Sequence, residues 1–326
     1  MKLPDFVQIE PVGQCNLACR MCPVAYRGEG ATRGKPPAFM SYDTFCGVLD
    51  QFPEIRHLQL QGMGEPFLHP RLFDMVRYAS ARGIEVTTNS NLTALSPRRA
   101  EECVASGLAK LHVSIDAADA EAYAYIRVGS QLGRVLRNLD LIQAAKQRSG
   151  AALPEIILVC VVMRRNLEQL ESLVRLAAAH GVRSMSVQHL AHDFTEGTLP
   201  EKYQPMREFV DAETLLAVDA ARVEGCFEEA RRVADEAGVA LRLPNIAKRG
   251  PRGCDWPWRG AYLSFSGDAM PCCMVATPDR LNFGNVVKDG VADVWNNEAY
   301  NAFRARLASD DPPEICRGCA VYNGTF

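Results

Sequence analysis

The chain has 326 residues, of which 48% are hydrophobic and 23% charged, and its formal net charge is −3. This composition is typical of a globular protein with one large domain, or one plus a small appendage, and it favours neither a nucleic-acid nor a membrane-surface partner. The longest apolar run, residues 156–162, is too short to span a bilayer, and the N-terminus lacks the apolar segment of a signal peptide. We therefore expect a cytoplasmic protein that binds neither nucleic acid nor membrane.

Strand-like runs alternate with helical periodicity through the first two thirds of the chain. Several of these runs are apolar on both faces, as buried parallel strands are. The predicted strands cover residues 7–11, 57–62, 84–89, 111–116, 155–163 and 184–190. Apolar residues at helical spacing predict helices over 132–142 and 167–177, and Ser96 before Pro97 is typical of a helix start. Because a full TIM barrel has more repeats, six βα units in about 200 residues predict an α/β fold with a partial (β/α)6 barrel.

The pattern changes near residue 205. A helical stretch rich in Glu, Ala and Arg covers 211–237, and Gly225 could interrupt it. A short strand and a Gly/Pro/basic linker come next. After the linker, residues 261–273 predict a β-hairpin that turns at 266–268, and residues 293–307 predict a helix.

Twelve cysteines need an explanation, because disulfides are rare in a reducing compartment. Clustered thiols in such a protein favour metal or cluster ligation. Two clusters are present: Cys15, Cys19 and Cys22, and Cys254, Cys272, Cys316 and Cys319. The others are interpreted as small buried apolar side chains: Cys46, Cys103, Cys160, Cys226 and Cys273.

The first cluster has the spacing C-x3-C-x2-C over residues 15–22. Three thiolates can hold three irons of a [4Fe–4S] cluster and leave one iron open, and an open position is typical of a catalytic metal site. The cysteine loop follows the first predicted strand, and ligands of α/β folds bind at the carboxyl ends of the strands. A zinc site with a remote fourth ligand and an electron-transfer cluster are the alternatives.

The segment CNLACRMC, residues 15–22, resembles the signature of the radical S-adenosylmethionine (radical SAM) superfamily. LQGMGEP at 60–66, TTNSN at 87–91, VSIDAAD at 113–119 and the stretch 123–139 also resemble elements of that family, so the resemblance covers most of residues 6–190. It implies that SAM binds the open iron through its amino and carboxylate groups. It also implies that an electron from an external reductant of the flavodoxin or ferredoxin type cleaves SAM to a 5′-deoxyadenosyl radical, which abstracts hydrogen from the substrate.

The resemblance also implies roles for five residues. Gly64 and Glu65 would contact the SAM amino group, and Arg127 would bind the SAM carboxylate through its guanidinium. Asn89 and Ser114 would bond the ribose or the carboxylate. The alternatives are a solvated loop residue for Glu65, turn or cap residues for Asn89 and Ser114, and a surface charge for Arg127.

One position departs from the family pattern. The residue before the third cysteine is often aromatic and flanks the adenine, whereas here it is Met21, which can still pack against the adenine. Polar residues at the barrel mouth are expected to contact the substrate. They are Tyr26, Arg27, Glu29, Gln188, His189 and His192.

The C-terminal segment resembles the SPASM/Twitch extensions of some radical SAM enzymes. It contains Cys254, then Gly267 and Cys272 spaced G-x4-C, then Cys316-x2-Cys319. The resemblance implies one fully ligated auxiliary [4Fe–4S] cluster, because no further cysteine-rich tail follows before Phe326. Cys273 could replace Cys272 as the ligand, and a structural zinc is the alternative metal. The expected domains are a radical SAM core barrel at 1–205, a helical linker with a short strand at 206–250, and a SPASM/Twitch domain at 251–326.

An auxiliary cluster that conducts electrons from a substrate radical implies a net oxidation. The main hypothesis is therefore a dehydrogenase of a polar, sugar- or aminocyclitol-like small molecule. The alternatives are an epimerase with Cys160 or Cys273 as hydrogen donor, a maturase of a ribosomally made peptide, and a non-catalytic electron-transfer protein. The 14 residues before Cys15 are too few for a leader-peptide recognition domain, which a separate protein could supply.

Overall fold

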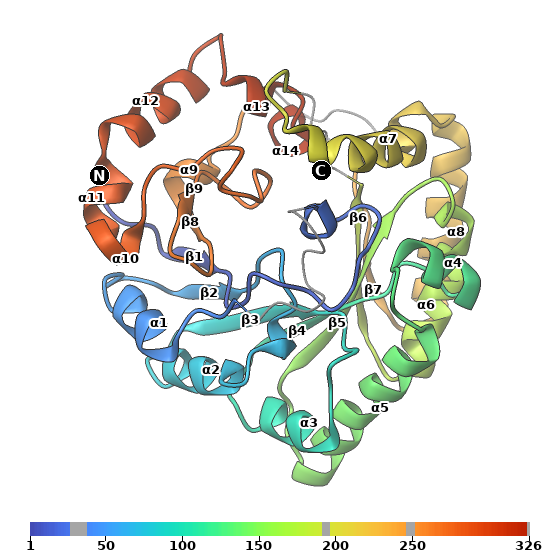
Figure 1. Ribbon diagram of the computed structural model, residues 1–326. Coiled ribbons are helices and arrows are strands. Elements are labelled where there is room, and N and C mark those ends of the chain that lie inside the picture. The colour runs from blue at the N-terminus through green and yellow to red at the C-terminus, as the bar shows by residue number, and fades with distance from the viewer. Residues whose placement is uncertain (27–37, 191–195, 246–251, 325–326) are drawn as a thin grey trace.

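Parallel strands follow one another around a curved sheet in the computed structural model, which describes residues 1–326 except 27–37, 191–195, 246–251 and 325–326 (Figure 1). The sheet order is β7-β6-β5-β4-β3-β2-β1-β8-β9. Its first seven strands are β1 Phe6–Ile9, β2 His57–Leu60, β3 Glu85–Ser90, β4 Lys110–Ser114, β5 Glu155–Val162, β6 Ser184–His189 and β7 Ala240–Arg242. The structure therefore confirms the predicted α/β partial barrel.

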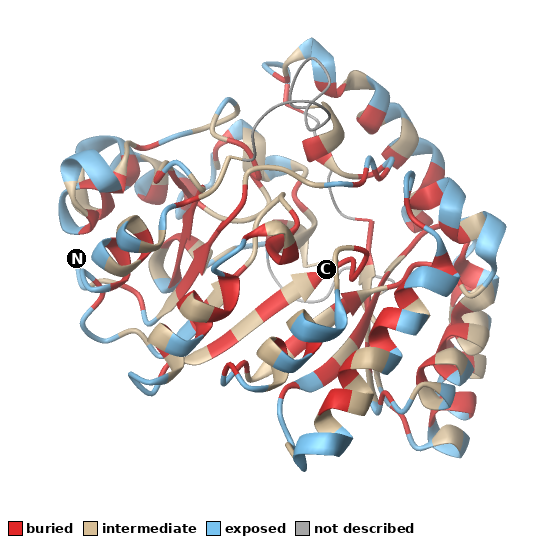
Figure 2. Ribbon diagram, turned by 60° about the horizontal axis from the view of Figure 1, so that its bottom comes forward, coloured by how far each residue is buried: buried red, intermediate tan, exposed pale blue. Residues whose placement is uncertain are grey.

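The two faces of the sheet differ in polarity. Successive side chains of a strand point to opposite faces. One face is buried under the outer helices (Figure 2). Leu58, Val86 and Leu111 on this face are apolar and buried. The other face lines the barrel interior and carries polar residues such as Gln59 and Asn89. The outer helices are α1 Tyr42–Leu49, α2 Leu72–Ser80, α3 Pro97–Val104, α4 Ala120–Ile126, α5 Leu132–Ser149 and α6 Leu170–Ala179.

Helix ends agree with the sequence in some places and differ in others. Ser96 caps α3 by accepting a hydrogen bond from the Arg99 backbone N–H, as its position before Pro97 predicts. The predicted helix over 211–237 is in fact two helices, α7 Gln204–Glu213 and α8 Ala220–Ala237. The break lies at 214–219 because Thr214 caps a short 3-10 helix, Leu215–Ala217, and Asp219 caps the start of α8. Helix α8 continues through Gly225, where an added Cβ would meet open space.

The C-terminal segment extends the barrel sheet. Strand β8 (Gly260–Leu263) pairs in parallel with β1, and β9 (Ala269–Met270) pairs antiparallel with β8. The predicted hairpin is confirmed, with Gly267 in the turn at φ +87°. Short helices complete this part: α9 Trp256–Arg259, α10 Val286–Asp289, α11 Val291–Asn296, α12 Glu298–Leu307, α13 Glu314–Arg317 and α14 Ala320–Asn323.

The single helix predicted over 293–307 is divided at Asn297, which caps α12 by accepting from the Tyr300 backbone N–H. The domain boundaries at 205 and 250 stay predictions. Within the described ranges, no helix is long and apolar enough to cross a membrane.

Candidate active site

The three N-terminal cysteines lie on the loop that follows β1. All three line one cavity of about 200 Å³ at the carboxyl ends of β1–β4. Every residue predicted to contact SAM lines the same cavity: Met21, Gly64, Glu65, Asn89, Ser114 and Arg127. In the view of Figure 1, the 3-10 helix η1 (Pro23–Tyr26) at the end of this loop lies inside the ring of strands. Segments up to 112 residues apart in the sequence thus meet at one site.

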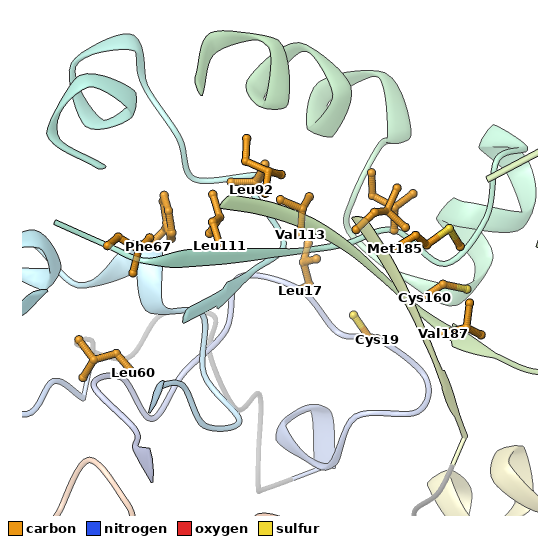
Figure 3. Close-up of a cluster of buried hydrophobic side chains, with 14 of the residues drawn as sticks. Leu17, Cys19, Leu60, Phe67, Leu92, Leu111, Val113, Cys160, Met185 and Val187 are labelled. Atoms are coloured by element: carbon orange, nitrogen blue, oxygen red, sulfur yellow. The ribbon is translucent and has the colours of Figure 1, made fainter. Parts of the chain in front are cut away.

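The cysteine loop is anchored by burial and by backbone hydrogen bonds. Leu17 and Cys19 belong to the same buried cluster as Leu111 and Val113 on β4 (Figure 3). The Ala18 N–H donates to the Val128 carbonyl at 2.9 Å, which ties the loop to the end of α4. The Cys15 sulfur accepts from the Leu17 N–H at 3.4 Å and from the Asn91 side chain at 3.6 Å. These contacts hold the loop and the Cys15 thiol at the cavity.

The thiols have chemistry that suits iron–sulfur ligation. Burial raises the pKa of Cys15, and Glu65 raises it further. Burial also raises the pKa of Cys19 to about 12, although the nearby Arg127 acts in the opposite direction. Metal coordination deprotonates a thiol outright. Iron can therefore supply the positive charge that these buried thiolates need, and the donor set fits a [4Fe–4S] cluster.

A buried glutamate that the sequence analysis missed holds the glycine segment at the cavity wall. The Glu10 carboxylate, fully buried at the end of β1, accepts from the backbone N–H groups of Met63 at 2.8 Å and Gly64 at 3.1 Å. Both glycines of the segment need this close approach. A Cβ on Gly62 would lie 2.4 Å from the Glu10 side chain, and one on Gly64 would lie 1.8 Å from the Val12 carbonyl oxygen. The sequence carries no signal for this role of Glu10, because the role depends on contacts that only the folded sheet creates.

Glu65 is buried, and its hydrogen bonds connect the end of β2 to the end of β3. It is 3% exposed, and its carboxylate accepts from the Phe67 N–H, the Ser90 hydroxyl and the Asn91 N–H. Burial raises the pKa of Glu65, while these donors act in the opposite direction. The structure thus excludes a solvated loop residue at this position. Glu65 fixes the end of β3, where Asn89 and Asn91 line the cavity.

Arg127 forms a buried ion pair. Its Nε donates to the Asp116 carboxylate at 2.7 Å, and the side chains are 11% and 0% exposed, respectively. Asp116 also accepts from the Val161 N–H, so it is fixed to β5. No residue in the described ranges bonds the two Nη groups of Arg127, and the side chain lines the cavity. Arg127 is therefore not a surface charge, and it can present two donors to an anion.

The expected substrate residues lie in different environments. The Tyr26 hydroxyl donates to the Arg20 carbonyl at 3.1 Å. Gln188 pairs in register with Val161 on the face that lines the barrel interior. His189 points to the opposite face, and its Nε2 bonds the Asn245 carbonyl at 2.6 Å, which indicates a structural role. The expected contacts Arg27, Glu29 and His192 lie outside the described residues.

Cys160 does not face the cavity. It is fully buried on the helix-covered side of β5, next to Val187 and Met185 (Figure 3). Its neighbour in the strand, Val159, instead pairs with Ser114 on the interior face. This placement argues against Cys160 as a hydrogen donor, because the donor must reach a substrate radical inside the barrel.

The C-terminal cysteines gather into a second group. Cys319 packs with Cys254, Cys316 and Met274 in a small cluster beside α12–α14. Burial raises the pKa of Cys272, and the neighbouring thiols of Cys273, Cys319 and Cys316 raise it further. Three of the four predicted ligands thus pack together, and Cys272 lies near Cys316 and Cys319, so a fully ligated auxiliary cluster at these four thiols stays a prediction. Cys273 shares this environment, so the choice between Cys272 and Cys273 remains a prediction.

Comparison with known proteins agrees with this geometry. The chain is 26% identical over 317 residues to a tungsten-containing aldehyde ferredoxin oxidoreductase cofactor-modifying protein of Pyrococcus furiosus, covering 92% of this chain and 83% of that one. It is 27% identical to a PqqA peptide cyclase of Xanthomonas euvesicatoria, covering 97% and 80% of the two chains. The crystal structure of Streptococcus suis SuiB bound to precursor peptide SuiA has the same fold, with a TM-score of 0.70 and 15% identity over 99% of this chain and 71% of that one.

Two family models match separate parts of the chain. The radical SAM superfamily model matches residues 9–177, and the SPASM iron–sulfur cluster-binding domain matches residues 254–320. These families imply SAM, a [4Fe–4S] cluster that binds it, and auxiliary iron–sulfur ligation. The chain belongs to the radical SAM superfamily and carries a C-terminal SPASM domain.

Proposed function

We propose that this enzyme modifies a peptide by radical chemistry that starts from SAM. The observation that carries the proposal is the joint placement of Cys15, Cys19 and Cys22 with Gly64 and Arg127 around one cavity. The similarity to PqqA peptide cyclases over 97% of the chain supports a peptide substrate. It favours the maturase alternative over the small sugar- or aminocyclitol-like substrate that was the main hypothesis from the sequence.

Each group at the cavity has a task in this proposal. The thiolates of Cys15, Cys19 and Cys22 hold a [4Fe–4S] cluster and leave one corner for SAM. The bound cluster and SAM supply a 5′-deoxyadenosyl radical for hydrogen abstraction. Arg127 offers its Nη groups to the SAM carboxylate, and the Gly64 backbone, fixed by the Glu10 side chain, faces the SAM amino group.

Neutral polar side chains complete the cavity wall. Asn89 and Ser114 orient the ribose, and Met21 packs against the adenine. The C-terminal group, Cys254, Cys272, Cys316 and Cys319, holds an auxiliary cluster with no open corner, which suits electron transfer. An external one-electron donor of the flavodoxin or ferredoxin type supplies the reducing electron.

The Pyrococcus relative favours a second candidate, the modification of a cofactor rather than a peptide. One experiment separates the two. The anaerobically reconstituted enzyme is incubated with SAM, a reductant, and short peptides encoded beside its gene, and the products are analysed by mass spectrometry. We expect a peptide mass change accompanied by 5′-deoxyadenosine, and neither product from a Cys15→Ala variant. A mass change in a cofactor precursor or an aminocyclitol, with every peptide unchanged, would overturn the proposal.

A further inference from the structure

A second polar cavity lies at the ends of β6 and β7, on the edge of the sheet farthest from β9. It has a volume of about 210 Å³, and Ser186, Gln188, Arg242 and Asn245 are among its lining residues. None of its lining residues borders the cysteine cavity. His189 fixes one wall, because its Nε2 bonds the Asn245 carbonyl at 2.6 Å.

Three side chains of this cavity face the barrel interior. Ser186 is the register partner of Arg242 on one side and of Val159 on the other, and Val159 in turn pairs with Ser114. Neighbours in register point to the same face of a sheet, so Ser186 and Arg242 share the face of Ser114, which lines the cysteine cavity. Gln188, two residues after Ser186, points the same way. The second cavity therefore lies on the same face of the sheet as the cysteine cavity, the face that lines the barrel interior.

The polar groups of Ser186, Gln188 and Arg242 have no side-chain hydrogen bond or ion pair with any residue that the structure describes. Other polar groups on the interior face are paired. Gln59 donates to Gln61, and Lys110 pairs with Glu85 at 2.8 Å. Arg242 is exposed on an edge strand, so its side chain is accessible to solvent. The Arg242 guanidinium, together with the Ser186 hydroxyl and the Gln188 amide, can therefore bind an anionic ligand.

We propose that this cavity binds a carboxylate of the substrate. The site rests on the proposed peptide-modifying function and adds a specificity determinant to it. The planar fork of Arg242 can bind a carboxylate through two parallel hydrogen bonds, and the Ser186 hydroxyl and Gln188 amide can donate to the same oxygens. The carboxylate belongs to an acidic side chain or to the C-terminus of the peptide.

Three small probes distinguish these sources: N-acetyl-L-glutamic acid α-amide, N-acetyl-L-alanine and the neutral N-acetyl-L-glutaminamide. Their dissociation constants are measured by ligand-observed NMR on the SAM-loaded holoenzyme. We expect at least one acidic probe to bind about fivefold more tightly than the neutral probe, and the tighter of the two identifies the source. Arg242→Gln should abolish the preference and Arg242→Lys should keep part of it. Arg134→Gln, at an exposed arginine on α5, should change nothing.

Equal affinity for acidic and neutral probes, or an unchanged preference in Arg242→Gln, would overturn the carboxylate site. The measurement needs no turnover, so its result does not depend on whether the proposed function is correct. An enzyme that binds the acidic probes but modifies no peptide contradicts the proposed function and leaves the site standing. An enzyme that modifies peptides without any carboxylate preference contradicts only the site.

Discussion

The carboxylate of Glu10 accepts a hydrogen bond from the Gly64 backbone N–H at 3.1 Å, across 54 residues of sequence. The same carboxylate oxygen accepts from the Met63 N–H, and the other oxygen accepts from the Phe265 N–H of the C-terminal hairpin at 3.5 Å. One buried side chain thus joins β1, the glycine segment at the cavity wall, and the SPASM part of the chain.

Replacing Glu10 by glutamine tests whether its hydrogen bonds hold the Gly64 segment in place. Glutamine keeps the shape but turns one acceptor into a donor that faces backbone N–H groups, so the Gly64 segment should shift. We expect the dissociation constant for SAM to rise about tenfold while the iron content stays constant. Glu54→Gln, at an exposed carboxylate, is the control and should bind SAM normally. Normal SAM affinity in Glu10→Gln would show that the glycine segment holds its position without the carboxylate.

Variants of the ion pair between Arg127 and Asp116 distinguish a structural role of Arg127 from a direct role in SAM binding. Arg127→Gln leaves the buried Asp116 charge unpaired, so we expect a loss of about 3 kcal/mol in the free energy of unfolding and at least tenfold weaker SAM binding. Adding Asp116→Asn removes the unpaired charge and should restore much of the stability but not the affinity. Denaturant unfolding and equilibrium SAM binding measure the two effects. Recovery of SAM affinity in the double variant would contradict a direct contact between Arg127 and SAM.

His69 predicts a pH dependence of stability. Burial lowers the pKa of His69, and the nearby cations Arg99 and Arg71 act in the same direction. Its Nε2 bonds the Met40 carbonyl at 2.9 Å. The folded state keeps the ring neutral, whereas the unfolded chain binds a proton below about pH 6.5, so the contribution of His69 is complete above that pH and is lost as the pH falls toward the folded pKa.

The variant His69→Gln retains a donor for the Met40 carbonyl but cannot titrate. The unfolding midpoint of the wild type should therefore fall more steeply than that of the variant as the pH falls below about 6.5. Urea unfolding at a series of pH values measures the difference. Parallel pH profiles for the two proteins would show that His69 has the same pKa in the folded and unfolded states.

Cys160→Ala tests the hydrogen-donor hypothesis. Because Cys160 lies on the helix-covered side of β5, the variant should keep the wild-type rate of product formation and lose about 1 kcal/mol of stability. Product and 5′-deoxyadenosine are measured together. Loss of product with continued formation of 5′-deoxyadenosine would instead identify Cys160 as the donor.

The barrel could be predicted from the sequence because its strands are buried and apolar, and strands such as 155–163 stand out for that reason. The other cavity residues could be expected because their short motifs resemble those of the radical SAM superfamily, whereas the cysteine spacing by itself indicated an open cluster. The partners Glu10 and Asp116 could not be predicted, because each acts through contacts that only the folded sheet creates. Gly225 is the interruption that the sequence suggests, but the break between α7 and α8 lies earlier, because the caps at Thr214 and Asp219 end and restart the helices.

An iron count after anaerobic reconstitution tests most directly the claim that three thiols hold a SAM-binding cluster and four hold a separate auxiliary cluster. We expect about eight irons per chain in the wild type and about four in the triple variant Cys15→Ala/Cys19→Ala/Cys22→Ala. The triple variant should also lose SAM cleavage. A wild-type count near four, or a triple variant that still cleaves SAM, would contradict the division of the thiols into a radical-generating site and an auxiliary site.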